Sequence, residues 1–171
     1  MLRWGILLAL AVLAADQVTK ALIVANFPIY SATTPKIEEI TPFLNIWHVR
    51  NSGIAFSIGN FSDGGRYIIG ALAFVVAAGL ILAGRRSTST AQTAAYALIA
   101  GGAVGNAFDR LNPFRQTVVD FIDIHVSGIH WPSFNVADSA IVVGVALILA
   151  DMFFFSEGRK SPPSSSSSSQ E

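Results

Sequence analysis

Long apolar stretches, with most of the charged residues lying between them, organise this chain. Residues 67–84 and 87–108 carry no charge, and residues 136–155 contain only Asp138 and Asp151, one near each end. A helix needs about 20 mostly apolar residues to cross a bilayer. Each of these stretches therefore predicts a transmembrane helix.

A further apolar stretch, residues 4–27, is interrupted by Asp16 and Lys20. Its beginning also resembles a secretory signal peptide, with Arg3 before an apolar segment and alanines after it. The apolar character resumes from Ala21 to Phe27, beyond those alanines. This continuation favours a membrane helix over a cleaved leader.

Positive charges gather at one side of the predicted bundle: Arg3, Arg85, Arg86, Arg159 and Lys160. Because Lys and Arg in short connections stay in the cytoplasm, both termini are expected there. The predicted fold class is an all-α membrane protein, an antiparallel bundle of four transmembrane helices with N-in/C-in topology.

The two longer connections would then lie outside. Within them, residues 43–49 and 117–124 are rich in β-branched and aromatic side chains and predict short strands of a small extracytoplasmic β-cradle. Residues 161–171, two prolines and then a serine run, predict a disordered cytoplasmic tail beyond a membrane domain at 1–160.

Composition supports this interpretation. Of the 171 residues, 52% are hydrophobic and only 13% charged, and the formal net charge is +0. These values exclude a largely disordered chain and favour no nucleic-acid partner, which would need a basic face. The absence of cysteine excludes disulfides and cysteine-ligated metals.

Polar residues recur at the outer ends of the predicted helices: Asn106, Asp109, Asn135 and Asp138, with Asp120 and Asp123 in the connection between them and Asp16 deeper. Charges inside a membrane are costly, so each suggests a function. For Asp16 and Lys20, one helical turn apart, a structural ion pair facing the bundle interior is an equal alternative.

Most site chemistries lack their sequence pattern. There is no Gly-x-Ser-x-Gly elbow and no His-Glu-x-x-His spacing. His125 and His130, five apart in an expected loop, are interpreted as surface histidines, so no metal or cofactor is predicted. What remains is a pair of carboxylates that share a proton, one activating water and the other polarising a carbonyl.

Two other classes stay open at this point. Intramembrane carboxylates also suit a proton-coupled transporter, although the chain has none of the repeated halves that are common in transporters. A membrane scaffold without catalytic activity is the third alternative.

Five motifs then resemble, in order, those of the bacterial lipoprotein signal peptidases (signal peptidase II): Asp16-Gln17-Val18-Thr19-Lys20, Asn51-Ser52-Gly53-Ile54-Ala55-Phe56-Ser57, Gly105 to Arg110, Val118-Val119-Asp120-Phe121 and Phe134-Asn135-Val136-Ala137-Asp138. The resemblance extends from the first predicted helix to the fourth. It implies an aspartic endopeptidase with Asp120 and Asp138 as the catalytic dyad.

The resemblance also implies roles for the other motif residues. Asn51, Asn106, Arg110 and Asn135 would hold the substrate backbone or orient the dyad, and Asp16, Lys20, Gly53 and Asp109 would shape the site. Gly53 is compatible with a flexible flap and equally with a simple turn.

The implied substrates are diacylglyceryl-modified prolipoproteins, cleaved on the amino side of the lipidated cysteine. The family implies a multi-pass protein of the bacterial cytoplasmic (inner) membrane, in contact with membrane lipid and with its active site at the outer face. It also implies no cofactor and inhibition by globomycin-type cyclic peptides.

Overall fold

A computed structural model describes residues 1–53, 63–87 and 89–155. Residues 54–57 of the second motif and the predicted tail at 161–171 therefore lie outside the described residues.

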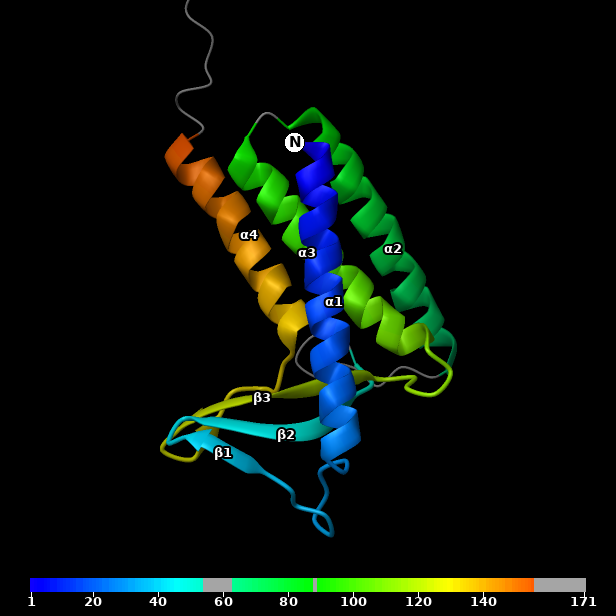
Figure 1. Ribbon diagram of the computed structural model, residues 1–171, viewed down its shortest axis with the longest axis vertical. Helices are drawn as coiled ribbons and strands as arrows, with labels where there is room; N and C mark the ends of the chain where they lie inside the picture. Colours follow the sequence, from blue (N-terminus) through cyan, green and yellow to red (C-terminus); the bar gives the residue numbers. More distant parts are fainter. Residues whose placement is uncertain (54–62, 88, 156–171) are drawn as a thin grey trace, which may run out of the picture.

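Four helices lie side by side, with a small sheet across one end (Figure 1). They are α1 (Leu2–Asn26), α2 (Asp63–Arg86), α3 (Thr90–Leu111) and α4 (Val136–Phe155). The first and fourth predicted ranges agree with α1 and α4 to within two residues, whereas α2 begins four residues before the predicted 67.

The third helix lies three residues further along the chain than the predicted 87–108. Ser89 caps its start, because the Ser89 hydroxyl accepts a hydrogen bond from Gln92 N at 3.3 Å. At the other end Pro113 disfavours helical geometry for Asn112, so α3 ends at Leu111. Asp109 and its neighbour Arg110 therefore belong to α3 rather than to the following connection.

Helix α3 packs against α1, α2 and α4. Glycines permit this packing: a Cβ at Gly101 would lie 2.6 Å from Ala9 O, and one at Gly102 would collide with Ala137 O. Among the described residues, three helical segments are long and apolar enough to cross a membrane: Leu2–Asn26, Gly64–Arg86 and Val136–Phe154. The central α3 is less apolar and is not one of them.

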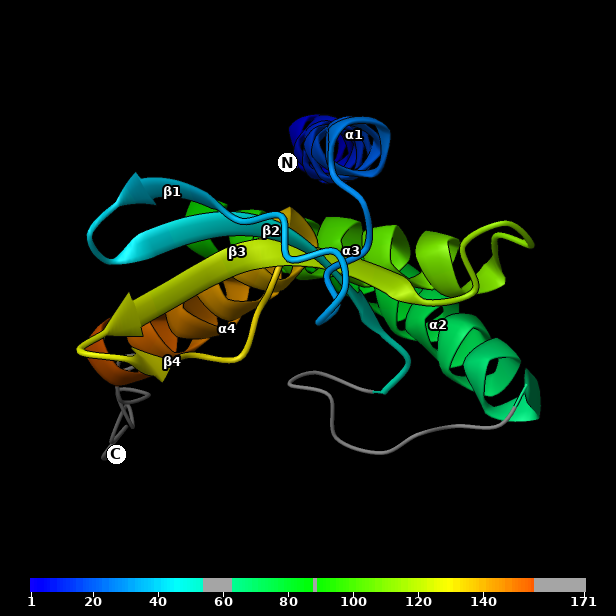
Figure 2. The ribbon, with the colours of Figure 1, turned by 90° about the horizontal axis from the view of Figure 1, so that it is seen from below.

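The sheet has the strand order β1-β2-β3-β4 and is antiparallel. Its strands are β1 (Glu38–Thr41), β2 (Leu44–Asn51), β3 (Val118–Val126) and β4 (Ile129–His130). The two predicted strands are confirmed as β2 and β3, while β1 and β4 were not predicted. Figure 2 shows the sheet crossing the end of the bundle near α3 and α4.

An apolar cluster fixes β3 against the bundle. Val119 and Phe121 of β3 pack with Ile23 of α1, and Phe27 and Val136 adjoin them. Beside this cluster the interior becomes polar: the largest fully buried side chains include Asp16, Lys20, Asp109, Asp120, Asp123 and Asn135. Since buried charges cost free energy unless they are paired, the members of this set around Lys20 and Asp120 mark the candidate site, while Asp123 lies apart from them.

Candidate active site

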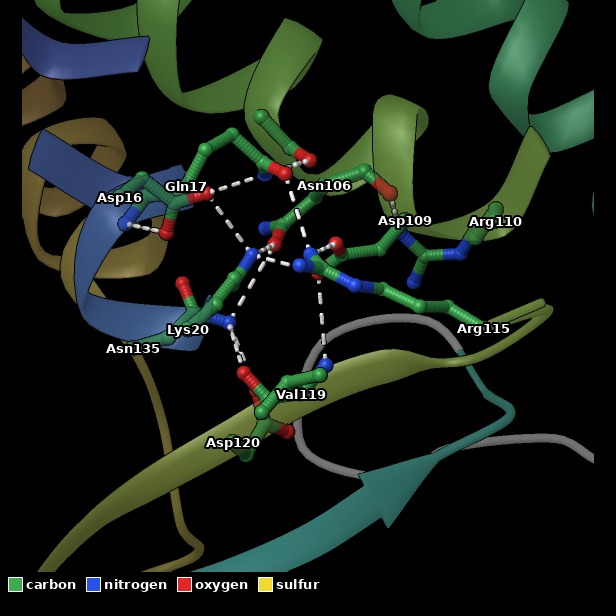
Figure 3. A network of polar contacts seen from close by, with 12 residues as sticks. Asp16, Gln17, Lys20, Asn106, Asp109, Arg110, Arg115, Val119, Asp120 and Asn135 are labelled. Atoms are coloured by element: carbon green, nitrogen blue, oxygen red, sulfur yellow. Dashed lines mark hydrogen bonds and ion pairs between the residues drawn. The ribbon is translucent and has the colours of Figure 1, made fainter. Parts of the chain in front are cut away.

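Lys20 lies at the centre of one group of buried charges (Figure 3). Its ammonium is 2.9 Å from Asp16 Oδ2, 2.8 Å from Asp109 Oδ2 and 3.0 Å from Asn106 Oδ1. Arg115 completes the group through an ion pair with Asp109 Oδ1. The two aspartates are therefore neutralised by two cations, and the predicted Asp16–Lys20 ion pair is present.

The same group joins three helices. Asp16 Oδ1 accepts a hydrogen bond from Ala137 N, 3.0 Å away, which ties α1 to the first turn of α4. Gly105 of α3 leaves room for this carboxylate, since a Cβ there would lie 2.6 Å from Asp16 Oδ2. Gln17 donates to Gly105 O at 3.2 Å. These contacts place α4, and Asp138 on it, relative to α1 and α3.

A second group contains the two carboxylates of the implied dyad, and uncharged amides hold it. Asn135 Nδ2 donates to Asp120 Oδ1 at 2.7 Å, and Asn51 Nδ2 donates to Asp120 Oδ2 at 2.9 Å. Asn106 Nδ2 donates to Asp138 Oδ1 at 2.7 Å. Asn135 contacts both carboxylates, because its backbone N also donates to Asp138 Oδ2 at 3.3 Å.

Each of these amides is held in one orientation by a partner that can only donate. Lys20 donates to Asn106 Oδ1, the backbone N of Asp138 donates to Asn135 Oδ1 at 2.9 Å, and that of Gly53 donates to Asn51 Oδ1 at 2.9 Å. With the oxygens occupied in this way, the NH₂ groups must face the carboxylates. The Lys20 ammonium group thus orients the amide of Asn106 toward Asp138.

Burial raises the pKa of Asp120 from its ordinary value to about 6, and the negative charge of Asp138 adds to this effect. The hydrogen bonds from Asn51 and Asn135 act in the opposite direction. Asp120 is only 2% exposed and lies on β3, outside the helices. A carboxyl group with a pKa this close to neutrality can both take up and release a proton at working pH.

Two cavities border Asp138. One has a volume of 190 Å³ and is lined by the polar residues Asn51, Asn106, Arg110 and Asp138 together with the apolar Ile69, Ala73, Ala103, Val118 and Ile141. The Arg110 guanidinium donates to Gly53 O at 2.7 Å and so holds the segment that follows Asn51. The other cavity, 310 Å³, is largely apolar and is lined by Trp131, Phe134, Asp138, Ser139, Val142 and Val143. The Asp138 carboxylate therefore adjoins an apolar surface.

Every predicted site residue joins one of these groups: Asp16, Lys20, Asn51, Gly53, Asn106, Asp109, Arg110, Asp120, Asn135 and Asp138. The contributions of Gln17, Gly105 and Arg115 were not predicted. Gln17 and Gly105 lie inside two of the five motifs named above, and this membership was the signal that could have identified them.

The placement of His125 and His130 in a loop was wrong, because His125 lies in β3 and His130 in β4. His48 lies in β2, within the predicted strand at 43–49. His48 is buried and its Nδ1 is 2.9 Å from Phe27 O, whereas His125 and His130 stack beside Asp123 with ring centroids 5.0 Å apart. The hairpin turn Ser127-Gly128, with φ angles of 52° and 80°, brings these two histidines together.

Comparisons with known proteins agree with this geometry. The family model described as "Signal peptidase (SPase) II" matches residues 8–154. A lipoprotein signal peptidase of Aeromonas hydrophila is 45% identical over 89% of each chain, and one of Pseudoalteromonas atlantica is 42% identical over 85% of this chain and 87% of its own. A bacterial membrane enzyme solved by the in meso method at 2.3 Å resolution shares 32% identity and a TM-score of 0.76 over 92% of each chain.

Proposed function

The chain belongs to the signal peptidase II family, and we propose that Asp120 and Asp138 carry out its peptide hydrolysis as an aspartic pair. The protein removes signal peptides from prolipoproteins. This agrees with the peptidase interpretation of the sequence and not with the transporter alternative. The observation that carries the aspartic mechanism is that Asn135 contacts two carboxylates at once, the buried Asp120 and the partly buried Asp138.

In the proposed reaction the two carboxyl groups share one proton. Asp120, with a pKa of about 6, is ionised at neutral pH and is assigned the role of base. It takes a proton from the attacking water, while protonated Asp138 donates to the scissile carbonyl oxygen. As the tetrahedral intermediate collapses, a proton passes to the leaving amine and the shared proton is restored.

We further propose that the substrates are diacylglyceryl-modified and are cleaved on the amino side of the lipidated cysteine. The apolar cavity beside Asp138 supports this substrate, because the exposed side chains of Trp131, Val142 and Val143 offer an apolar surface next to the carboxylates. A lipid-anchored precursor could thus keep its acyl chains in the bilayer while its peptide bond reaches the dyad.

The same proposal assigns a location to the site. All four helices would cross the bacterial inner membrane, with both termini in the cytoplasm and the sheet and dyad at the outer face. The arginines at the end of α2, Arg85 and Arg86, support this orientation. Helix α3 can cross despite its lower hydropathy because it is enclosed by the other three helices.

Single cysteines test the orientation without background labelling, since the chain has none of its own. A membrane-impermeant thiol reagent applied to spheroplasts should label a cysteine placed at Ser127, in the β3–β4 turn. It should not label one at Ser87, between α2 and α3. Labelling at position 87 from outside would invert the proposed topology.

The reaction is tested on purified protein in detergent with two forms of one prolipoprotein, with and without diacylglycerol on the cysteine. We expect mass spectrometry to find a product that begins at the modified cysteine, and inhibition by a globomycin-type cyclic peptide. Equal cleavage of the unmodified form would contradict the proposed substrate class. Cleavage at another bond would contradict the proposed site.

A further inference from the structure

Four polar residues outside the catalytic region lie on one face of the sheet. Asp123 and His125 are two apart on β3, so their side chains point to the same side. The strand register places Asn45 of β2 opposite Asp123 and His130 of β4 opposite His125. Three adjacent strands therefore direct these side chains to one point.

The contacts confirm this convergence. His130 Nδ1 lies 2.9 Å and 3.0 Å from the two carboxylate oxygens of Asp123, and His125 Nδ1 lies 3.7 Å from Asp123 Oδ2. One ligand atom from each of these three residues lies within 4.8 Å of the others. Asp123 is 0% exposed, while the His130 side chain is 46% exposed, so the group can be reached from solvent.

Within the described part of the chain, the Asp123 carboxylate contacts no lysine or arginine. Its partners are Asn45, His125 and His130, none of which carries a permanent charge. Asp16 and Asp109, equally buried, share Lys20. A fully buried carboxylate is costly without a compensating cation, so this position favours one.

The amide of Asn45 adds a second observation. Asn45 is 6% exposed, and its Oδ1 is buried without a hydrogen-bond partner among the described residues. Its Nδ2 lies 2.9 Å from Asp123 Oδ2 and 3.4 Å from His125 Nδ1. Since no described residue holds Oδ1, a half-turn of the amide would direct this oxygen toward Asp123, His125 and His130. The amides of the catalytic site differ, because a donor holds each of their oxygens.

We propose that Asp123, His125 and His130 bind a divalent transition-metal ion, with Zn²⁺ as the best match, and that Asn45 Oδ1 or water fills the fourth position. Imidazole and carboxylate ligands suit zinc at about 2.0–2.2 Å, which places neighbouring ligand atoms of a tetrahedron about 3.3 Å apart. The distances of 2.9–3.7 Å from the two imidazoles to Asp123 bracket this separation.

The ion would be structural rather than catalytic. It would join β4 to β3, a connection that otherwise consists of a short strand pair and the hydrogen bond from Trp131 N to Ile124 O at 2.7 Å. Asp123 and Asp120 are three apart on β3 and so point to opposite faces of the sheet. The metal site and the dyad are thus separate.

Zinc binding to the purified protein, carrying an affinity tag free of histidine, tests the proposal. A chromophoric chelator competes for the ion, and Co²⁺ in its place reports coordination geometry through its visible absorption. The background is low, because the chain has no cysteine and its other histidine, His48, is only 2% exposed. We expect one ion per chain and a Co²⁺ spectrum of tetrahedral type.

Substitutions define the ligands. Asp123→Asn, His125→Gln and His130→Gln should each weaken zinc binding on the order of 100-fold, beyond the effect typical of residues that only support ligands. Glu38→Gln is the matched control, because Glu38 is an exposed carboxylate of the same sheet that pairs with Ile46 and not with Asn45. The Glu38→Gln variant should bind zinc with the same affinity as the unaltered chain.

Thermal unfolding monitored for each variant separates ligand loss from misfolding, and the half-exposed His130 is the safest position to change. Equal zinc affinity in His130→Gln and Glu38→Gln would overturn the proposal. Failure of the unaltered chain to bind zinc at micromolar concentration would overturn it as well. Neither result depends on peptidase activity.

Discussion

Two pairs of aspartates, all buried except the partly buried Asp138, lie where the helices meet the sheet, and they differ in what surrounds them. Asp16 and Asp109 share the ammonium of Lys20, and Arg115 adds a second cation. Asp120 and Asp138 are held chiefly by the amides of asparagines. Cations therefore compensate the charges of the first pair, whereas uncharged amides surround the second pair.

In the proposed mechanism this difference separates a structural role for the first pair from a chemical role for the second. A cation that pairs closely with a carboxylate stabilises the charged form and removes its use as a proton carrier. Neutral donors orient a carboxylate at a smaller cost to its basicity. Asn106 links the two pairs, since Lys20 holds its oxygen while its nitrogen holds Asp138.

The largest expected effect comes from removing a carboxylate from the amide-held pair. Asp120→Asn and Asp138→Asn should each lower cleavage by about 10³-fold or more, because an amide keeps the volume but cannot take up a proton. The double variant should be no worse than either single one, since the pair acts as a unit. The rate of cleavage of a diacylglyceryl-modified prolipoprotein measures these losses.

Both variants should purify with an unchanged thermal unfolding midpoint or a higher one, because each loses a charge that is buried (Asp120) or partly buried (Asp138). Full activity of Asp120→Asn would end the dyad assignment.

The cation-held pair should respond through stability instead. Lys20→Met leaves Asp16 and Asp109 buried with less compensating charge, and loss of one partner of a buried ion pair costs about 3–5 kcal/mol. Denaturant unfolding in detergent measures the free energy. Combining Lys20→Met with Asp109→Asn should recover part of this loss, and no recovery would argue against the charge explanation.

The pH dependence distinguishes the pairs more finely. Because the pKa of Asp120 is about 6, kcat/KM should fall as the pH drops through 6 and the base becomes protonated. The hydrogen bond from Asn51 lowers this pKa, so Asn51→Ala should move the acid limb to higher pH. Asn26→Ala, which removes an exposed amide at the end of α1, should leave the profile unchanged.

The smallest effect on cleavage is expected at Asp123. Asp123→Asn should change the rate by at most severalfold, because the side chain faces away from Asp120 across β3. A loss as large as that of Asp120→Asn would mean that the two faces of the sheet do not act independently.

The motif residues were predictable because apolar periodicity and motif order are local features of the chain. The ranges 4–27 and 136–155 predicted α1 and α4 closely, and the polar residues at their sheet ends do converge. The shift of α3 depended on the Ser89 cap and on Pro113, which apolar content alone does not detect. The histidine pair was missed because the two-residue turn Ser127-Gly128 was not recognised.

By itself the sequence determined where the helices run and which carboxylates and amides lie near their ends, because hydrophobic content and residue type do not depend on packing. Apart from the Asp16–Lys20 pair, one helical turn apart, only the tertiary structure decided which aspartates receive a cation and which receive amides. Asp16 meets the backbone of Ala137 across 121 positions, and Asn51 meets Asp120 across 69. Such pairings depend on the close approach of helices at glycine and on strand register, so they follow from packing in three dimensions.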